Sequence, residues 1–185
     1  MQKSFNQKRS SNPKICAIVP VYNEGSEISK FLVALAGTLK QLSKNIEIIV
    51  VDDGSRDKTA TFVREMVDKL PIKLICFSRN FGKERAISAG LDHADADVTL
   101  IIDGDFQHPL ESVPQLYEKW QEGYDNVYAV RSQRRGQPFL IRWMSNLFYK
   151  LNRWVMNIEL PANAGDFRML DRKVVTALQK MGERN

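Results

Sequence analysis

The chain has 185 residues, of which 43% are hydrophobic and 26% charged, and its formal net charge is +5. This length and composition are typical of one globular domain. It contains no run of 18 apolar residues and no cysteines at metal or disulfide spacing, so the sequence excludes a membrane span within these residues and favours a reducing compartment.

The expected elements alternate between strands and helices. Residues 1–14 carry four basic residues and no acid, and we expect a disordered basic tail rather than a signal peptide. Continuous apolar runs predict strands, and apolar residues at three- and four-residue steps predict helices. Strands are expected at residues 15–21, 46–51, 72–77, 98–102 and 126–130, and helices at residues 28–39, 57–70, from the mid-80s to about 93, and 114–121.

This alternation predicts the fold class. Strands that are apolar on both faces and separated by helices indicate an α/β domain over residues 15–185, with a mostly parallel central sheet and helices on both faces. Cys16 and Cys76 lie inside two of the apolar runs, so we expect both in the core.

Polar side chains follow each expected strand at the point where it ends. The carboxyl ends of parallel strands meet at one edge of a sheet, and ligands bind in the crevice there. A purely structural protein has no reason to place its charges there so systematically, and the pattern therefore favours an active site. The clusters are Asn23 with Glu24, Asp52 with Asp53, Arg79 with Lys83, Asp103 with Asp105, and Arg131.

Asp103 and Asp105 form the most informative of these clusters. Residues i and i+2 of an extended chain point to the same side, and Gln107 continues the series. Two carboxylates with space beside them suit Mg²⁺ or Mn²⁺ that carries the phosphates of a ligand. An acidic turn is the alternative, because Asp and Gly are common turn residues.

Asp53 and Lys83 are the other candidates that can be read from the residues alone. A carboxylate after a buried strand can accept hydrogen bonds from a nucleotide base or ribose, and a lysine near a helix start can meet a phosphate. The alternatives are a helix cap and a solvated lysine. The glycine fingerprint of dinucleotide folds, the Walker loop and a Ser-His-Asp set are all missing.

The stretch from Arg131 to Ile158 carries six basic residues and no acid. Nucleic acid, acidic lipid and a phosphorylated ligand are candidate partners. Within it, residues 139–156 place aromatic and apolar residues at helical spacing beside basic ones, which is typical of a membrane-interface helix and equally of a core-facing helix. Carboxylates at the strand ends would repel a nucleic-acid backbone.

Taken together, six ordered motifs resemble family 2 glycosyltransferases of the GT-A fold, within them the polyprenyl-phosphate glycosyltransferases. That group includes dolichol-phosphate mannosyltransferases and bactoprenol glucosyltransferases. The resemblance covers residues 15–185. The motifs are Pro20-Val-Tyr-Asn-Glu24, Asp52-Asp-Gly-Ser55 with Asp57 and Thr59, Arg79-Asn-Phe-Gly-Lys-Glu84, Asp103-Gly-Asp-Phe-Gln-His-Pro109, Arg131-x-x-Arg134 and Gly165-Asp-Phe-Arg168.

The resemblance implies a role for each motif. Residues of the different motifs would line the nucleotide pocket, bind the divalent metal, bind the acceptor phosphate and lie near the reacting groups. Pro20, Tyr22, Glu24 and Asp53 would line the nucleotide pocket, with Lys83 and Gly104 beside the donor; Asp103, Asp105 and Gln107 would hold Mg²⁺ or Mn²⁺; Arg131 and Arg134 would bind the acceptor phosphate; and Asp105 and Asp166, the latter with Arg168, would lie near the reacting groups.

It also implies an activity. We expect an inverting transfer of a hexose, glucose first, from a nucleotide-sugar to a polyprenyl phosphate such as undecaprenyl phosphate, for cell-surface glycan modification. The expected donor is UDP-glucose, with GDP-mannose second, and the place of action is the cytoplasmic face of a bacterial inner membrane. Mannosyl transfer from GDP-mannose and a non-catalytic nucleotide- or membrane-binding fragment are the alternatives. A homo-oligomer is compatible with the sequence, and nucleic acid is not an expected partner.

Members of the family continue into amphipathic and transmembrane helices, so we expect residues 15–185 to be a catalytic domain cut from a longer membrane protein.

Overall fold

The structure, a computed structural model, describes residues 9–130 and 164–180. Chain contacts divide the protein into two units, residues 1–128 with 166–185 and residues 129–165. The described residues contain a six-stranded sheet of order β3-β2-β1-β4-β6-β5. Its strands are β1 (Ile15–Val21), β2 (Ile46–Asp52), β3 (Ile72–Cys76), β4 (Val98–Ile101), β5 (Asn126–Val130) and β6 (Ala164–Asp171).

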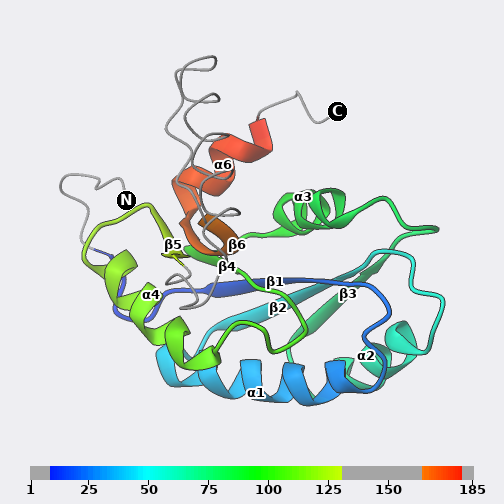
Figure 1. Cartoon of the computed structure of the whole chain (residues 1–185). Helices are drawn as coiled ribbons and strands as arrows, with labels where there is room; N and C mark the ends of the chain where they lie inside the picture. Colours follow the sequence, from blue (N-terminus) through cyan, green and yellow to red (C-terminus); the bar gives the residue numbers. More distant parts are fainter. Residues whose placement is uncertain (1–8, 131–163, 181–185) are drawn as a thin grey trace, which may run out of the picture. The chain divides into compact units, whose positions relative to one another are not determined.

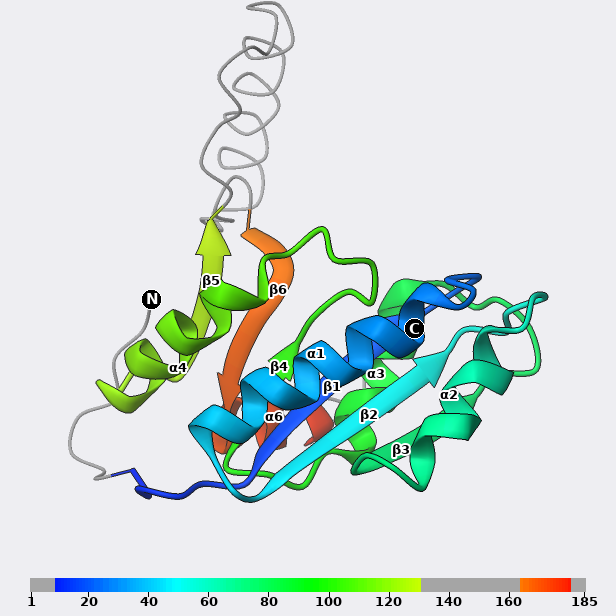
Figure 2. The same ribbon diagram turned by 90° about the horizontal axis from the view of Figure 1, so that it is seen from below.

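Helices cover the sheet on both sides (Figures 1 and 2). On one face lie α1 (Glu27–Leu42), α2 (Thr59–Val67) and α4 (Val113–Gln121), the last preceded by a 3₁₀ turn at Leu110–Ser112. On the other lie α3 (Lys83–His93) and α6 (Arg172–Lys180). The helical spacing of apolar residues in α1 explains its packing, because the same residues are its buried face: Ile28, Phe31, Leu32, Leu35, Ala36 and Leu39.

The centre of the sheet is parallel. β1 pairs with β2 and with β4, and β2 pairs with β3, all in parallel register. Every residue of β1 is buried, which fits a strand covered on both faces. The α/β class, the mostly parallel sheet and the nine elements expected from the sequence are confirmed.

Two elements were not expected from the sequence. β6 lies between β4 and β5 and runs antiparallel to β4, with Ile101 opposite Arg168 and Val98 opposite Asp171. α6 follows directly and packs on the core beside α3, where Leu170 and Val175 join the buried cluster of α3 and β1.

The two cysteines differ in burial. Cys16 is buried in β1, and burial raises the pKa of its thiol to about 12. Cys76 is exposed, so the expectation that it lies in the core is wrong. The reason is topological: β3 is an edge strand, and an apolar sequence run does not reveal its place in the sheet.

The structure also differs from the expectation of a disordered tail at residues 9–14. The Arg9 guanidinium lies 2.9 Å from Asp125 and 3.3 Å from Asp171, with its side chain 8% exposed. It also stacks over the Trp120 ring at 4.5 Å and donates to the Tyr124 carbonyl. The basic composition of the segment predicted that it would be solvated. Arg9 instead packs on the domain, because Asp125, Asp171 and Trp120 contact its side chain.

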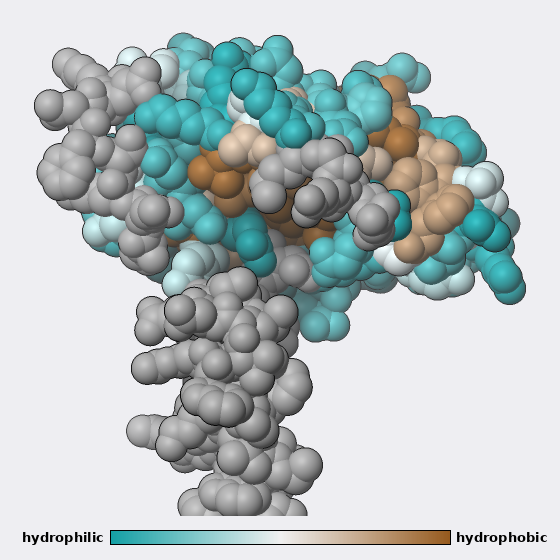
Figure 3. Space-filling view, turned by 90° about the horizontal axis from the view of Figure 1, so that it is seen from above, coloured by the Kyte–Doolittle hydropathy of each residue, from teal (hydrophilic) through white to brown (hydrophobic). Residues whose placement is uncertain are grey.

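Seen from the side of α3 and α6, the described surface is mostly hydrophilic, with apolar patches near its middle and toward one end (Figure 3). Among the helices of residues 9–130 and 164–180, none has both the length and the apolar content to cross a membrane.

Candidate functional site

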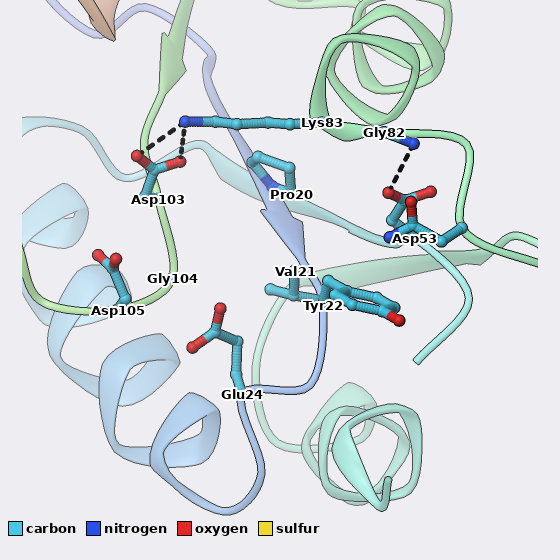
Figure 4. Close-up of a pocket in the computed structure, with 11 residues that line it drawn as sticks. Pro20, Val21, Tyr22, Glu24, Asp53, Gly82, Lys83, Asp103, Gly104 and Asp105 are labelled. Carbon is cyan, nitrogen blue, oxygen red and sulfur yellow. Dashed lines mark hydrogen bonds and ion pairs between the residues drawn. The ribbon is translucent and has the colours of Figure 1, made fainter. Parts of the chain in front are cut away.

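A pocket of about 440 Å³ opens at the C-terminal ends of β1, β2 and β4 (Figure 4). The sequence predicted that the strand-end motifs meet at one edge of the sheet, and the parallel register brings them together there. Most of the lining residues are those proposed from the sequence: Pro20, Tyr22, Glu24, Asp53, Lys83, Asp103, Gly104 and Asp105. The sequence reasoning did not single out the others, which are Val21, Asn80 and Gly82.

The loop after β1 and the loop after β2, which both border the pocket, are hydrogen-bonded to each other. The Asn23 backbone N–H donates to Ser55 Oγ, and the Asn23 side-chain oxygen accepts from the Arg56 N–H, both at 2.9 Å. The Gly25 N–H donates to both Asp57 and Thr59. The Thr59 hydroxyl and the N–H groups of Thr59 and Gly25 lower the pKa of Asp57. Asn23 and Asp57 therefore shape the loop that carries Tyr22 and Glu24.

Asp53 is hydrogen-bonded to the loop between β3 and α3. Its carboxylate is 3% exposed and accepts the N–H groups of Phe81 at 2.7 Å and Gly82 at 2.9 Å. The neighbouring Gly54 has φ +71°, and a Cβ there would lie 2.3 Å from the Arg79 backbone. Only glycine permits this approach of the two loops. Asp53 thus reaches the pocket while it fixes the start of α3.

Lys83, the first residue of α3, reaches across the pocket to Asp103 (Figure 4). Its Nζ lies 2.7 Å from Oδ1 and 2.9 Å from Oδ2. His108 Nε2 lies 3.5 Å from Oδ2 of the same carboxylate. His108 belongs to the motif that begins at Asp103, and the structure brings it into contact with that predicted metal ligand.

Carboxylates gather on one side of the pocket, where Glu24, Asp103 and Asp105 lie, while Asp53 and Tyr22 lie on the other (Figure 4). Burial raises the pKa of Glu24, and the charges of Asp105 and Asp103 add to the effect. This side of the pocket is therefore a region of negative potential that a cation would relieve.

The chain after Asp103 does not stay extended. Gly104 and Asp105 form a turn, and Phe106 has φ 56°. A Cβ on Gly104 would lie 3.0 Å from Ile28, so a glycine allows the turn to pack against α1. Gln107 is exposed, its backbone N–H bonds Asp105 Oδ1 at 3.0 Å, and it is not among the lining residues. The i, i+2, i+4 alternation expected for these residues is wrong, because the turn breaks it.

The side chains of the pocket supply some, but not all, of the ligands that a divalent metal needs. Asp103 and Asp105 supply the hard oxygen ligands that Mg²⁺ and Mn²⁺ prefer. Within residues 9–130 and 164–180, no three His, Cys, Asp or Glu side chains come together as a metal-binding group. A metal held here would take its remaining ligands from water and from the phosphates of a bound nucleotide.

Several candidates lie outside the description. Arg131, Arg134 and the helix expected at residues 139–156 are not among the described residues. The backbone of Asp166 belongs to β6, but its side chain is likewise outside the described part.

The comparison with family models settles the membership. The model for "Glycosyl transferase family 2" matches residues 16–178. The chain belongs to glycosyl transferase family 2. It is 41% identical over 173 residues to the prophage bactoprenol glucosyl transferase homolog of Escherichia coli (strain K12), covering 93% of this chain and 56% of that protein.

An uncharacterized glycosyltransferase of Synechocystis sp. is 40% identical over 175 residues, with 92% of this chain and 54% of the relative covered. The chain thus spans about half the length of the curated relatives it matches. Among solved structures, it resembles the mannosyltransferase PcManGT from Pyrobaculum calidifontis in complex with GDP-Man and Mn²⁺, with TM-score 0.60, 22% identity, and coverage of 96% of this chain and 50% of that one. This likeness shows the fold, which is GT-A.

Proposed function

We propose that this family 2 domain transfers a hexose, with inversion, from a nucleotide-sugar to a polyprenyl phosphate. The observation that carries the proposal is the pocket itself. Eight residues proposed from four separate motifs line one cavity at the carboxyl edge of the sheet. Relatives named bactoprenol glucosyl transferase, 39–41% identical over nearly the whole chain, support the acceptor class.

The donor would lie with its nucleotide near Asp53, Tyr22 and Pro20 and its diphosphate near Asp103. Asp53 is held by loop amides, so its remaining acceptor capacity is fixed in direction before a ligand arrives. Lys83, at the N-terminus of α3, would meet phosphate oxygens together with the helix dipole. Pre-organisation of these groups lowers the cost of ordering the donor.

Mg²⁺ or Mn²⁺ held by Asp103 and Asp105 would neutralise charge on the leaving diphosphate. In the transfer, an oxygen of the acceptor phosphate forms a bond to the anomeric carbon while the bond from that carbon to the diphosphate breaks. The acceptor phosphate is already anionic near pH 7, so the reaction needs no strong general base. The domain contributes in-line positioning and electrostatic stabilisation.

The acceptor side rests on residues beyond the described ones. Arg131 and Arg134 would bind the acceptor phosphate, and Asp166 would lie near the reacting groups. The basic segment from Arg131 to Met156 would lie on the membrane at headgroup level on the cytoplasmic face, where anionic lipid attracts each basic residue by about 1 kcal/mol. Replacement of Arg134, Arg135, Arg142 and Arg153 with Gln should then weaken sedimentation with anionic liposomes without changing nucleotide binding.

We place UDP-glucose first as donor because of the relatives' names, and GDP-mannose second. A thermal-shift panel of nucleotide-sugars with Mn²⁺ tests this choice, since a ligand that binds the folded state raises its melting temperature. Stabilisation by UDP-glucose and not by GDP-mannose is expected; the reverse would overturn the choice of glucose.

Release of nucleoside diphosphate tests the reaction itself. The chain, and a form extended to the length of its relatives, are incubated with donor, Mn²⁺ and a short-chain polyprenyl phosphate. Acceptor-dependent release in the extended form supports the transferase. Donor binding without any release would show a binding module instead.

A further inference from the structure

His108 belongs to the loop after β4 and lies against Phe167 of the strand β6. Its Nε2 is 3.5 Å from Asp103 Oδ2, and its side chain is 11% exposed. Its ring stacks on the Phe167 ring, with centroids 4.8 Å apart and planes 23° apart. Phe167 is itself 2% exposed. The imidazole is therefore confined between a rigid aromatic face and a carboxylate that faces the pocket.

The sheet register explains how these residues meet. Ile101, the last residue of β4, stands opposite Arg168 in the antiparallel β6. Phe167 is therefore placed beside the chain that leaves β4 toward Asp103. The stacking fixes the plane of the imidazole, so Nε2 keeps its direction toward Asp103. The Phe167 and Arg168 motif is in this way connected to the predicted metal loop.

Lys83 and His108 both contact Asp103, and they differ in how they are held. Lys83 comes from α3 and spans both oxygens with a side chain that is 40% exposed. A metal on Asp103 would compete with it for the same oxygens. His108 approaches only Oδ2 and comes from the same loop as Asp103. It can stay in place when Lys83 is displaced.

We propose that His108 is a positioning residue, which orients the Asp103 carboxylate for a divalent metal through Nε2. This inference rests on the metal assignment in the proposed function. Groups that hydrogen-bond to a metal ligand fix its orientation, and their removal typically weakens metal affinity by roughly 10- to 100-fold. A packing role alone would depend on the ring and not on the nitrogen.

Two substitutions separate the nitrogen from the ring. His108→Phe keeps an aromatic ring against Phe167 and removes the nitrogen, whereas His108→Gln keeps a donor at similar reach and removes the ring. We expect His108→Phe to weaken binding of Mn²⁺ alone, measured by calorimetry, by roughly 10-fold or more, while the melting temperature in EDTA stays near that of the unsubstituted chain. His108→Gln should stay within about threefold of the unsubstituted chain in Mn²⁺ affinity, since its side-chain amide presents a donor toward Asp103.

The matched control is His93→Phe, because His93 is exposed on α3 and bonds only its own helix carbonyl at Ala89 among the contacts described. Asp103→Asn tests the underlying site. If Asp103→Asn abolishes Mn²⁺ binding and His108→Phe does not weaken it, the positioning role is wrong. If Asp103→Asn binds Mn²⁺ like the unsubstituted chain, the metal assignment fails, and the role of His108 fails with it.

Discussion

The Lys83 ammonium spans the carboxylate of Asp103, 2.7 Å from Oδ1 and 2.9 Å from Oδ2. A divalent metal on Asp103 would compete with this ion pair. Lys83→Met should therefore strengthen binding of Mn²⁺ alone by about two- to fivefold, the range expected for a partly exposed pair. The same substitution should weaken binding of nucleoside diphosphate, because the phosphates lose the Lys83 ammonium as a partner. Calorimetric titrations measure both, with the exposed Lys40→Met as control; unchanged Mn²⁺ affinity would contradict the competition.

Asp105 is exposed at the rim of the pocket, so its replacement removes a carboxylate without opening the core. Asp105→Ala should lower the Mn²⁺-dependent affinity for nucleotide-sugar by roughly 10-fold, which corresponds to about 1.4 kcal/mol. The urea midpoint should stay the same. Titrations with and without Mn²⁺ test this, beside Asp68→Ala on α2's exposed end. An unchanged metal-dependent affinity would remove Asp105 from the proposed site.

Glu24 gives a prediction that depends on pH. Its pKa is raised by burial and by Asp105 and Asp103. A carboxyl whose folded pKa is raised binds more protons in the folded state, so its favourable contribution is complete below the ordinary pKa of 4.5 and is lost as pH rises through the folded value. Glu24→Gln should therefore be more stable than the unsubstituted chain at pH 7, with the difference disappearing near pH 4. Urea unfolding at both pH values measures it, and a difference that is the same at both would be inconsistent with this mechanism.

Asp53 is predicted to matter for loop order before any ligand binds. Asp53→Asn replaces one acceptor oxygen by an NH₂ group that faces a backbone N–H, so one partly buried amide loses its partner. The free energy of unfolding should fall by about 1–3 kcal/mol. Hydrogen exchange at Phe81 and Gly82 should become faster, and nucleotide affinity should decrease. Asp68→Asn, at an exposed position, is the control; unaltered exchange at both amides would refute the clamp.

Arg9 is predicted to contribute to stability rather than to binding. Its partners Asp125 and Asp171 are largely buried, and Trp120 also donates to Asp171 at 2.8 Å. Arg9→Met should cost about 3 kcal/mol in unfolding free energy because it leaves buried carboxylates without their cation.

The control for this change is Arg172→Met. Arg172 pairs with the exposed Asp95, and its loss should cost about 1 kcal/mol or less. Equal costs at the two positions would mean that the Arg9 contacts carry no special weight.

Much of the fold could be predicted from residues because apolar residues dominate β1, β2 and β4. β6 escaped notice for the opposite reason. Its sequence, Ala-Gly-Asp-Phe-Arg-Met-Leu-Asp, has a glycine and an aspartate near its start and a charged residue, Arg168, between the buried Phe167 and Met169, so it forms no apolar run. The strands beside it in the sheet, β4 and β5, also lie far from it in the sequence.

The residues of the candidate site also fall into those that the sequence could predict and those that it could not. Residues that follow a strand, such as Asp53 and Asp103, could be proposed because strand ends meet at one edge. His108 could not, since its role depends on Phe167, which lies in the strand that sequence reasoning missed. Gln107 does not follow the predicted alternation, because Gly104 and Asp105 form a turn that no apolar or polar pattern signals.

The position of β6 in the sheet also sets an order of events during synthesis. β1 to β4 and the loops that line the pocket are complete by residue 105, so they leave the ribosome before β5 and β6. The next strand in the chain, β5, has no place beside β4, because β6 occupies it. The edge of β4 therefore stays unpaired until residues 164–171 emerge, and a nascent chain that ends earlier exposes a buried hydrophobic strand to other chains. Chaperone binding to ribosome-bound chains of increasing length should fall sharply once residue 171 is outside.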